Sequence, residues 1–254
     1  MILNISEEPI TVIENGTYRF QLVNYPHIAD YELNSIITFI WYEKSHGRET
    51  EVICKNKNII SVVNNAVANL DGIENVLQLE ENKFVYHATN FIAARKILSE
   101  GKLLSATKVY SKTGGELAFE RRRSSWSDPA DYFEYIMFCD GDNPTGDYVV
   151  LSENFPSDED LENGNYNAGV RFYFRNEDII QHPEHTFDGY HAVKVKNEIL
   201  LFDYLYACII PEQYKDEIEN HILLELMSRV HYLSQSELEI SKWNQKVYDF
   251  VSKL

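Results

Sequence analysis

The sequence predicts an α+β protein, in which short strands and amphipathic helices follow one another in no repeating order. Runs of four to eight residues rich in aromatic and β-branched side chains are typical of strands and occur along most of the chain. Between them lie stretches with apolar residues three and four positions apart, the spacing of one helix face, and these dominate after Pro211. We find no internal repeat and no low-complexity linker.

Composition narrows the class of protein further. The chain has 254 residues, 44% of them hydrophobic, which is enough for a buried core in one or two domains. A net charge of −17 argues against broad attachment to nucleic acid or anionic lipid but leaves room for a local basic groove. No apolar run reaches the roughly 18 residues of a membrane span, and the N-terminus lacks a secretory signal pattern. Three scattered cysteines predict buried thiols in the cytoplasm rather than a metal cluster.

Residues 1–80 are expected to form an N-terminal accessory α+β unit, rich in strands. Residues 17–23 alternate between polar and apolar side chains in the manner of a half-buried strand. Residues 35–42 are β-branched and aromatic and predict a fully buried strand, which would form a hairpin with 50–55. Residues 59–70 have the apolar spacing of a helix.

Residues 81–215 are expected to form the main domain. It begins with a strand at Phe84–Tyr86 and a helix over 91–98, for which Asn90 is the expected N-cap and Gly101 the expected stop. The polar segment 111–131 predicts a long functional loop. Further strands are expected at 132–138, 148–151, 170–174, 198–202 and 205–210, with a short helical turn at 176–180. Residues 216–254 predict a C-terminal pair of amphipathic helices, 216–233 and 236–254, packed on that domain.

Four groups of residues are candidates for a site. His87 and Thr89 alternate with Ala88 on a strand, so both point to one face, where they can hold a ribose hydroxyl and an amide; a buried His satisfied by backbone is the simpler interpretation. Arg121, Arg122 and Arg123 can clamp a pyrophosphate through forked donors, or belong to a solvated surface.

Tyr132 and Tyr135 can stack on a flat ring such as nicotinamide, although ordinary packing explains most tyrosines. Glu198 opens an apolar run, where a carboxylate is either at a solvent-facing edge or placed for use. Glu177 and Glu153 lie in more polar sequence and are weaker candidates. His182, His185 and His191 lie close together, but their spacing matches no known metal site, and we expect no metal.

These segments resemble the ADP-ribosyltransferase fold. The similarity lies in Tyr86-His87-Ala88-Thr89, in the helix end from Ile97 to Ser105, and in Asn197-Glu198-Ile199-Leu200-Leu201. Within that fold the chain is most similar to the bacterial DarT-type nucleic-acid ADP-ribosyltransferases, with Glu120 to Arg123 at the family's arginine pair and Asp131 to Tyr135 at its aromatic strand. The resemblance spans about 84–215 and implies a split core of mixed and antiparallel sheets, with an N-terminal strand-rich unit and C-terminal helices outside it.

The resemblance also implies the chemistry. NAD would be the donor substrate, and its nicotinamide–ribose bond would break through an oxocarbenium-like state. Glu198 would steady that cation as the catalytic carboxylate, with His87 and Arg122 assisting. His87, Ala88 and Thr89 would hold the nicotinamide ribose, Arg121 to Arg123 the phosphates, and Tyr132 and Tyr135 the nicotinamide end.

The acceptor would be a nucleic acid or a protein, and the setting that of a toxin-like or phage-conflict effector with a possible antitoxin or inhibitor protein. Membrane attachment is not expected. Three alternatives stay open: NAD hydrolysis, transfer of an RNA 2′-phosphate to NAD, and an inactive interaction module of the same fold.

Overall fold

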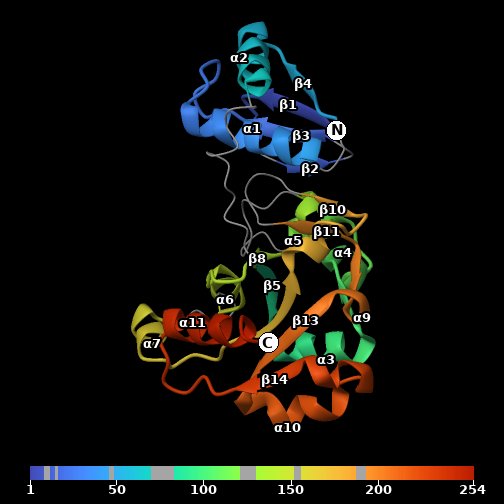
Figure 1. Cartoon of the computed structure of the whole chain (residues 1–254), viewed down its shortest axis with the longest axis vertical. Coiled ribbons are helices and arrows are strands. Elements are labelled where there is room, and N and C mark those ends of the chain that lie inside the picture. Colours follow the sequence, from blue (N-terminus) through green and yellow to red (C-terminus); the bar gives the residue numbers. More distant parts are fainter. Residues whose placement is uncertain are drawn as a thin grey trace. The chain divides into compact units, whose positions relative to one another are not determined.

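The computed structural model describes residues 1–8, 12–14, 17–45, 49–69, 83–120, 130–151, 156–186 and 193–254. These residues form a mixed α+β structure with parallel and antiparallel strand pairs. The chain divides into two compact units (Figure 1). The first comprises Met1–Glu81, Ala106–Tyr135 and Thr186–His191, and the second Asn82–Ser105, Ile136–His185 and Ala192–Leu254.

The first unit contains a four-stranded sheet in the order β2-β3-β1-β4. Its strands are β1 (Ile2–Ser6), β2 (Val12–Glu14), β3 (Thr17–Gln21) and β4 (Glu51–Cys54). β1 runs parallel to both β3 and β4, and β2 is antiparallel to β3. Leu3, Tyr18 and Phe39 belong to a core between this sheet and its helices.

The prediction of a strand over 35–42 is wrong, because α1 (Asp30–Ser45) covers it. Ile36, Ile37, Phe39 and Ile40 are buried, and this three-to-four spacing is that of a helix face. The start of α1 is fixed by the buried carboxylate of Glu32, which accepts hydrogen bonds from the backbone N–H of Val23 (2.8 Å) and Ala29 (2.9 Å). With a helix between β3 and β4, the expected hairpin to 50–55 is also wrong, and β4 joins the sheet in parallel. The predicted second helix is present as α2 (Lys57–Ala68).

The segment 106–135 is more helical than expected. It holds α4 (Ala106–Tyr110), α5 (Gly114–Glu120) and the 3-10 helix η2 (Ala130–Glu134). The loop predicted over 111–131 therefore contains a helix, and the strand predicted over 132–138 is shortened to β7 (Tyr135–Met137). The strand expected at 148–151 is wrong as well, since α6 (Thr145–Leu151) occupies it.

The second unit is organised on a five-stranded sheet in the order β14-β13-β9-β5-β8. The strands are β5 (Phe84–Thr89), β8 (Cys139–Asp140), β9 (Val170–Arg175), β13 (Leu205–Pro211) and β14 (Val230–Leu233). The β13–β14 pair is parallel, and the β13–β9, β9–β5 and β5–β8 pairs are antiparallel. In this register His87 lies opposite Phe172 and Ala88 opposite Arg171.

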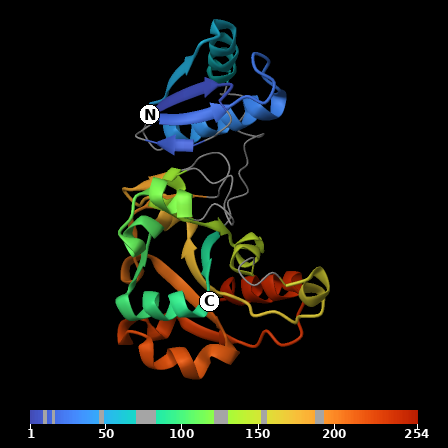
Figure 2. The same cartoon turned by 180° about the vertical axis from the view of Figure 1, so that it is seen from behind.

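Each face of this sheet is buried by different elements. Phe172 and Phe174 of β9 pack in one core with Leu98 of α3 (Phe91–Glu100). Tyr173 faces the other way, into a core with Trp243 of α11 (Ile240–Val251). Helices thus cover both faces, as the views from front and back show (Figures 1 and 2). β9 is consequently buried along nearly its whole length.

Two small sheets complete the strands of the described chain. β6 (Lys102–Leu104) pairs antiparallel with β12 (Glu198–Leu200), and β11 (Lys194–Lys196) lies between β10 (His185–Thr186) and β7. The remaining helical elements are α7 (Asp158–Glu162), α8 (Asn176–Ile179), α9 (Leu201–Tyr204), α10 (Lys215–Ile218) and the 3-10 helices Glu212–Tyr214, Glu219–His221 and Leu224–Arg229.

The predicted C-terminal helix pair is half wrong. The second helix exists as α11, but 216–233 breaks into short helical turns and ends in β14. Val230 to Leu233 complete the edge of the sheet beside β13, which supplies partners for their backbone groups. Arg229, the last residue of the 3-10 helix before β14, attaches that helix to α9 and the start of β13. Its Nη1 donates to the carbonyls of Leu201 (3.1 Å), Phe202 (3.1 Å) and Leu205 (2.9 Å).

The expected domain limits, 1–80, 81–215 and 216–254, stay predictions, since the two units are not contiguous segments of sequence. None of the described helices combines the length and the apolar character that crossing a membrane requires.

Candidate functional site

His87 lies near the end of β5, on the face of the sheet that carries Val85 and Phe172. Its Nδ1 is 3.0 Å from the carbonyl oxygen of Met137. A carbonyl only accepts, so Nδ1 carries the hydrogen and donates it. Burial lowers the pKa of His87, with the Met137 hydrogen bond opposing that shift, so the imidazole is neutral at pH 7. Its Nε2 is therefore left with a lone pair and can accept a hydrogen bond from a hydroxyl.

The residues that follow His87 extend this edge. Ala88 and Thr89 are partly buried, and Thr89 lies opposite Val170 of β9. Asn90 caps α3 as predicted, with Oδ1 accepting from the N–H of Ala93 at 3.0 Å. Gly101 ends that helix with φ of 70°, and a Cβ there would lie 2.7 Å from the ring of Phe202. The end of β5 thus leads directly into α3, a helix that is capped at its start and closely packed at its end.

Glu198 is the first residue of β12 and is exposed, whereas the next residue, Ile199, is fully buried. Its strand is fixed by its pairing with β6. Glu198 lies opposite Leu104 of β6, and the N–H of Ser105 donates to the carbonyl of Asn197 at 2.8 Å. Asn197 takes a positive φ of 68°, a conformation that Asn tolerates better than most residues. The carboxylate of Glu198 is therefore presented to solvent from a well-anchored backbone.

The fold brings the His87 and Glu198 strands into one unit. Val85 of β5, Leu103 of β6 and Ile199 of β12 pack in the same hydrophobic core. Ile136 and Phe138, which flank the His87 partner Met137, belong to that core too. Both residues therefore lie on strands that contribute to one core, and His87 is partly buried whereas Glu198 is exposed.

The other predicted site residues are less closely connected to these two. Arg121, Arg122 and Arg123 lie outside the described residues, and so does the rival Glu153. Tyr132 and Tyr135 are partly buried and belong to the first unit. Their proposed contact with nicotinamide stays a prediction.

A buried ion pair that the sequence did not reveal lies on the opposite face of the sheet. Arg171 of β9 and Asp147 of α6 are both fully buried and form a two-point ion pair through Nε and Nη2. Nη1 of Arg171 also donates to Tyr173 Oη (2.9 Å) and Asn244 Oδ1 (2.9 Å). Burial raises the pKa of Asp147, and the Arg171 guanidinium opposes that rise. These contacts fasten α6 and α11 to the sheet.

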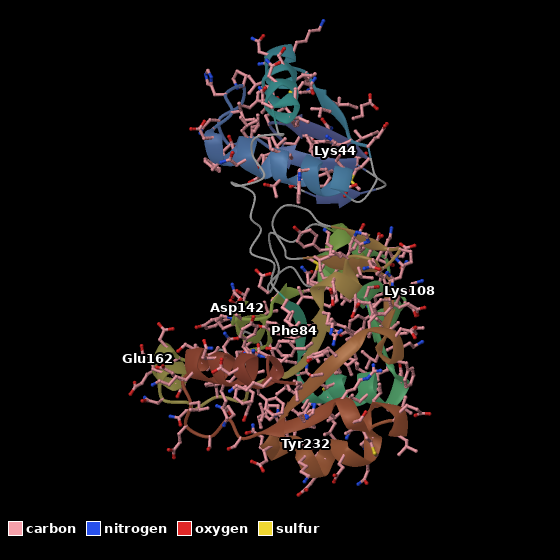
Figure 3. All side chains as sticks on the ribbon, viewed as in Figure 1. Lys44, Phe84, Lys108, Asp142, Glu162 and Tyr232 are labelled. Carbon is pink, nitrogen blue, oxygen red and sulfur yellow. The ribbon has the colours of Figure 1, made fainter. Side chains whose placement is uncertain are left out.

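Tyr86 joins this network from β5, next to His87. Its ring stacks on Tyr173 with centroids 5.3 Å apart, and the Arg171 guanidinium lies 4.7 Å from its centroid. Its hydroxyl donates to the carbonyl of Asn143 (2.7 Å) and accepts from the N–H of Gly146 (3.1 Å). A Cβ on Gly146 would lie 2.9 Å from this ring, which explains why glycine suits the position. The loop before α6 is also tied to β5 through Gly141, whose N–H donates to the carbonyl of Phe84 at 2.8 Å (Phe84 is labelled in Figure 3).

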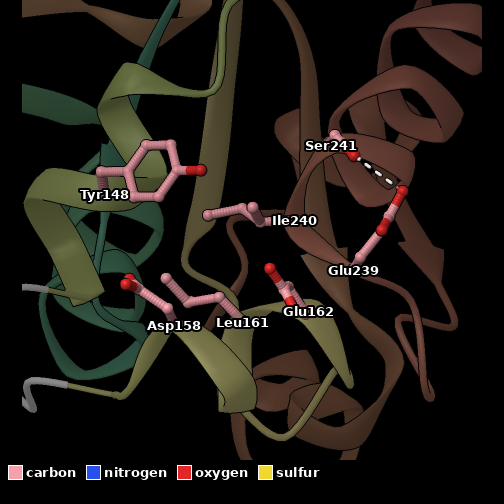
Figure 4. Close-up of a pocket in the computed structure, with 7 residues that line it drawn as sticks. All are labelled: Tyr148, Asp158, Leu161, Glu162, Glu239, Ile240 and Ser241. Carbon is pink, nitrogen blue, oxygen red and sulfur yellow. Dashed lines mark hydrogen bonds between the residues drawn. The ribbon is translucent and has the colours of Figure 1, made fainter.

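An acidic hollow of about 310 Å³ lies elsewhere in the second unit, between α6, α7 and the start of α11 (Figure 4). Its charged lining consists of Asp158, Glu162 and Glu239, and Tyr148 borders it. The Ser241 hydroxyl donates to Glu239 at 2.9 Å, and this contact lowers the Glu239 pKa. Three carboxylates repel the phosphates of a dinucleotide, so this hollow does not suit NAD.

The histidine group also has a structural explanation. His182 follows α8, and its Nδ1 accepts from the N–H of Glu184 at 3.1 Å. His191 lies outside the described residues. Within the described ranges no set of three His, Cys, Asp or Glu side chains is arranged to hold a metal ion.

Comparison with known proteins gives no relative from which to transfer a function: no family model, no curated protein and no solved structure matches the chain.

Proposed function

We propose that the protein is an NAD-dependent mono-ADP-ribosyltransferase that modifies a nucleic-acid or protein acceptor. The observation that carries the proposal is that two anchored polar groups lie in one compact unit, on strands that contribute to the same hydrophobic core. His87 offers a neutral imidazole with Nε2 as acceptor, and Glu198 offers an exposed carboxylate from a strand held by Leu104 and the buried Ile199. The sequence motifs around both residues support the same reaction.

In this reaction the bond between C1′ of the ribose and the nicotinamide nitrogen breaks, and nicotinamide leaves with the bonding electrons. Positive charge then develops on C1′ and the ring oxygen. The Glu198 carboxylate stabilises that charge, and such preorganised groups supply much of an enzyme's rate enhancement. The acceptor attacks C1′ and loses a proton, so that one ADP-ribose group is transferred.

His87 and Thr89 act on the donor. Nε2 of His87 accepts a hydrogen bond from a ribose hydroxyl and thereby fixes the sugar relative to Glu198. The partly buried Ala88 and Thr89 continue that edge. Arg121 to Arg123 are assigned the phosphates, with Arg122 as the member that assists catalysis, and Tyr132 and Tyr135 the nicotinamide end, all on the sequence resemblance.

The test is incubation of the protein with NAD and separate pools of DNA, RNA and protein, followed by mass spectrometry. We expect one pool to gain the mass of an ADP-ribose group and free nicotinamide to appear. Glu198→Gln is expected to lower this rate at least 100-fold, on the order of the loss when a transition-state stabiliser is removed. Glu177→Gln, which alters an exposed carboxylate on α8, is the matched control and keeps full activity.

Other outcomes would redirect or end the proposal. Free ADP-ribose without any adduct indicates hydrolysis, and a phosphate transferred from RNA indicates the phosphotransferase reaction. Equal activity of the Glu198→Gln and wild-type proteins would remove Glu198 from its role. For the effector setting, expression in a bacterial host is expected to be toxic, and Glu198→Gln is expected to relieve the toxicity.

A further inference from the structure

The outer face of α11 carries a basic groove. The groove has a volume of about 520 Å³ and runs between α11 and the end of β14. Its lining consists of Leu233, Lys242, Gln245, Lys246, Asp249, Phe250 and Lys253. Three lysines against one aspartate give this groove a positive charge, in a chain with 40 acidic and 23 basic residues. Its sign is therefore opposite to that of the molecule as a whole.

The spacing along α11 explains why the lysines share one face. Trp243, Asn244, Val247 and Val251 are buried, whereas Lys242, Gln245, Lys246 and Asp249 are exposed on the other side of the helix. Lys242 and Lys246 are one helical turn apart, about 6 Å along the axis, and Lys253 follows about 10 Å further on, just beyond the helix. The three lysines thus span roughly 16 Å along the direction of the helix axis.

Each lysine can still accept a ligand. Nζ of Lys246 donates to the carbonyl of Ser234 at 2.6 Å, which uses one of its three hydrogens. Lys242 is 3.4 Å from Glu239, and its side chain is 69% exposed, so solvent weakens this pair. Lys253 is exposed.

An aromatic ring lies within this row of charges. Phe250 is partly exposed in the groove, between Lys246 and Lys253 along the chain. His231 of β14 packs edge-on against it, with ring centroids 5.1 Å apart, and fixes its position. Burial lowers the pKa of His231, so this imidazole adds no charge at pH 7. The groove therefore combines cations for phosphates with an aromatic surface for a base.

We propose that this groove binds single-stranded nucleic acid, with phosphates on the three lysines and a base on Phe250. Stacking on an aromatic side chain combined with a basic track is the usual mode of binding for single strands. An acidic peptide would leave the ring unused. An anionic bilayer would favour projecting apolar side chains, whereas Phe250 and Leu233 are partly buried.

The groove also bears on the acceptor. If the bound strand is the molecule that is modified, the proposed transferase acts on nucleic acid, and this extension rests on the proposed function. Binding itself requires neither NAD nor Glu198, so the groove and the catalytic proposal can fail separately.

The experiment measures fluorescence anisotropy of a labelled 20-nucleotide oligo(dT) and oligo(U) with the full chain, in the absence of NAD. We expect binding at low salt, with log K falling against log[salt] at a slope of about −2, the value for three phosphates on a single strand. The variant Lys242→Gln/Lys246→Gln/Lys253→Gln is expected to lose most of this affinity and nearly all of the slope.

The matched control is Lys44→Gln/Lys55→Gln/Lys57→Gln, which removes the same charge from exposed lysines of the first unit (Lys44 is labelled in Figure 3). It is expected to bind like wild type. Phe250→Leu keeps an apolar side chain against the core and is expected to weaken binding several-fold without altering the salt slope. Circular dichroism verifies that each variant is folded.

Three results would overturn the inference. One is the absence of binding by the wild-type protein at low salt, and another is an equal loss in the groove variant and the control variant. The third is equal affinity for heparin or anionic vesicles together with no effect of Phe250→Leu, which would mean a surface for any polyanion. A groove variant that binds no oligonucleotide but still releases nicotinamide from NAD would support the groove while leaving the catalytic proposal intact.

Discussion

Asp147 and Glu198 are two carboxylates in the same unit with opposite surroundings. Asp147 is completely buried and paired with Arg171, whose guanidinium also donates to Asn244. The side chain of Glu198 is exposed, and only its backbone is held, by pairing with Leu104 and by the burial of the next residue, Ile199. The difference separates a charge that fastens the fold from a charge available to a substrate. Substitutions at the two positions should therefore affect stability and activity in opposite proportions.

The largest stability effect is expected at the buried pair. Asp147→Asn leaves the Arg171 guanidinium buried without a counter-charge, and removing one partner of such a pair typically costs about 3–5 kcal/mol. Urea denaturation measures the loss. A cost below about 1 kcal/mol would mean that water reaches the pair and that the contrast with Glu198 is false.

The next largest loss of stability is expected at Gly146, whose backbone packs against the Tyr86 ring of the Arg171 network. Gly146→Ala places a Cβ 2.9 Å from the Tyr86 ring, which must move away from Tyr173 and Arg171. Overpacking of this kind costs about 1–3 kcal/mol, visible as a lower midpoint of thermal unfolding. Outside its own helix backbone and chain neighbours, a Cβ at Gly115 would meet no atom within 4 Å, so Gly115→Ala serves as the control. Equal midpoints for the two variants would contradict the tight packing.

A smaller effect is expected at the helix that follows the His87 strand. Asn90→Ala removes the cap on the Ala93 N–H, and a lost N-cap costs about 1 kcal/mol. Asn90→Ser retains an acceptor and should restore most of the stability. Denaturation of the three proteins side by side is the measurement, and identical curves would show that the cap is dispensable.

The pH dependence distinguishes a neutral His87 from a charged one. Because the folded-state pKa of His87 lies below its unfolded value, the unfolded chain binds more protons, and stability falls as pH drops through about 6.5. Burial also lowers the pKa values of His182 and His231. The variant His87→Gln should therefore reduce the slope of stability against pH without abolishing it. Unfolding free energies at a series of pH values from 7.5 to 5 give the slopes. A steeper slope in the variant would mean that His87 is protonated in the folded protein.

The smallest stability effect is expected at Glu198. An exposed carboxylate away from caps and networks contributes within about 0.5 kcal/mol, so Glu198→Gln should unfold like wild type. A clear loss of stability would make Glu198 a structural residue and remove the contrast from which the catalytic proposal is drawn.

The sequence was informative where a local signal determined local structure. Asn90 and Gly101 bound α3 as their cap chemistry predicts, and the apolar run at β9 is a strand buried on both faces. It was misleading where tertiary context overrode propensity. The β-branched residues at 36–40 lie in α1, because their three-to-four spacing and the Glu32 contacts outweigh their preference for strands.

Long-range pairings explain the other failures. Val230 to Leu233 pair in parallel with β13, and no feature of the sequence near residue 230 predicts this pairing. The Arg171–Asp147 pair joins positions whose neighbours in the sequence are apolar or turn-forming, so each appeared unremarkable alone. At the candidate site the motifs predicted strands at His87 and Glu198, whereas the tautomer of His87 and the exposure of Glu198 required the structure.

The most direct test of the central claim is a crystal structure of the Glu198→Gln variant with NAD, in which turnover is blocked. We expect the nicotinamide ribose within about 2.6–3.2 Å of both the side chain at position 198 and Nε2 of His87. NAD bound away from these two groups, or no bound NAD at saturating concentration, would contradict it.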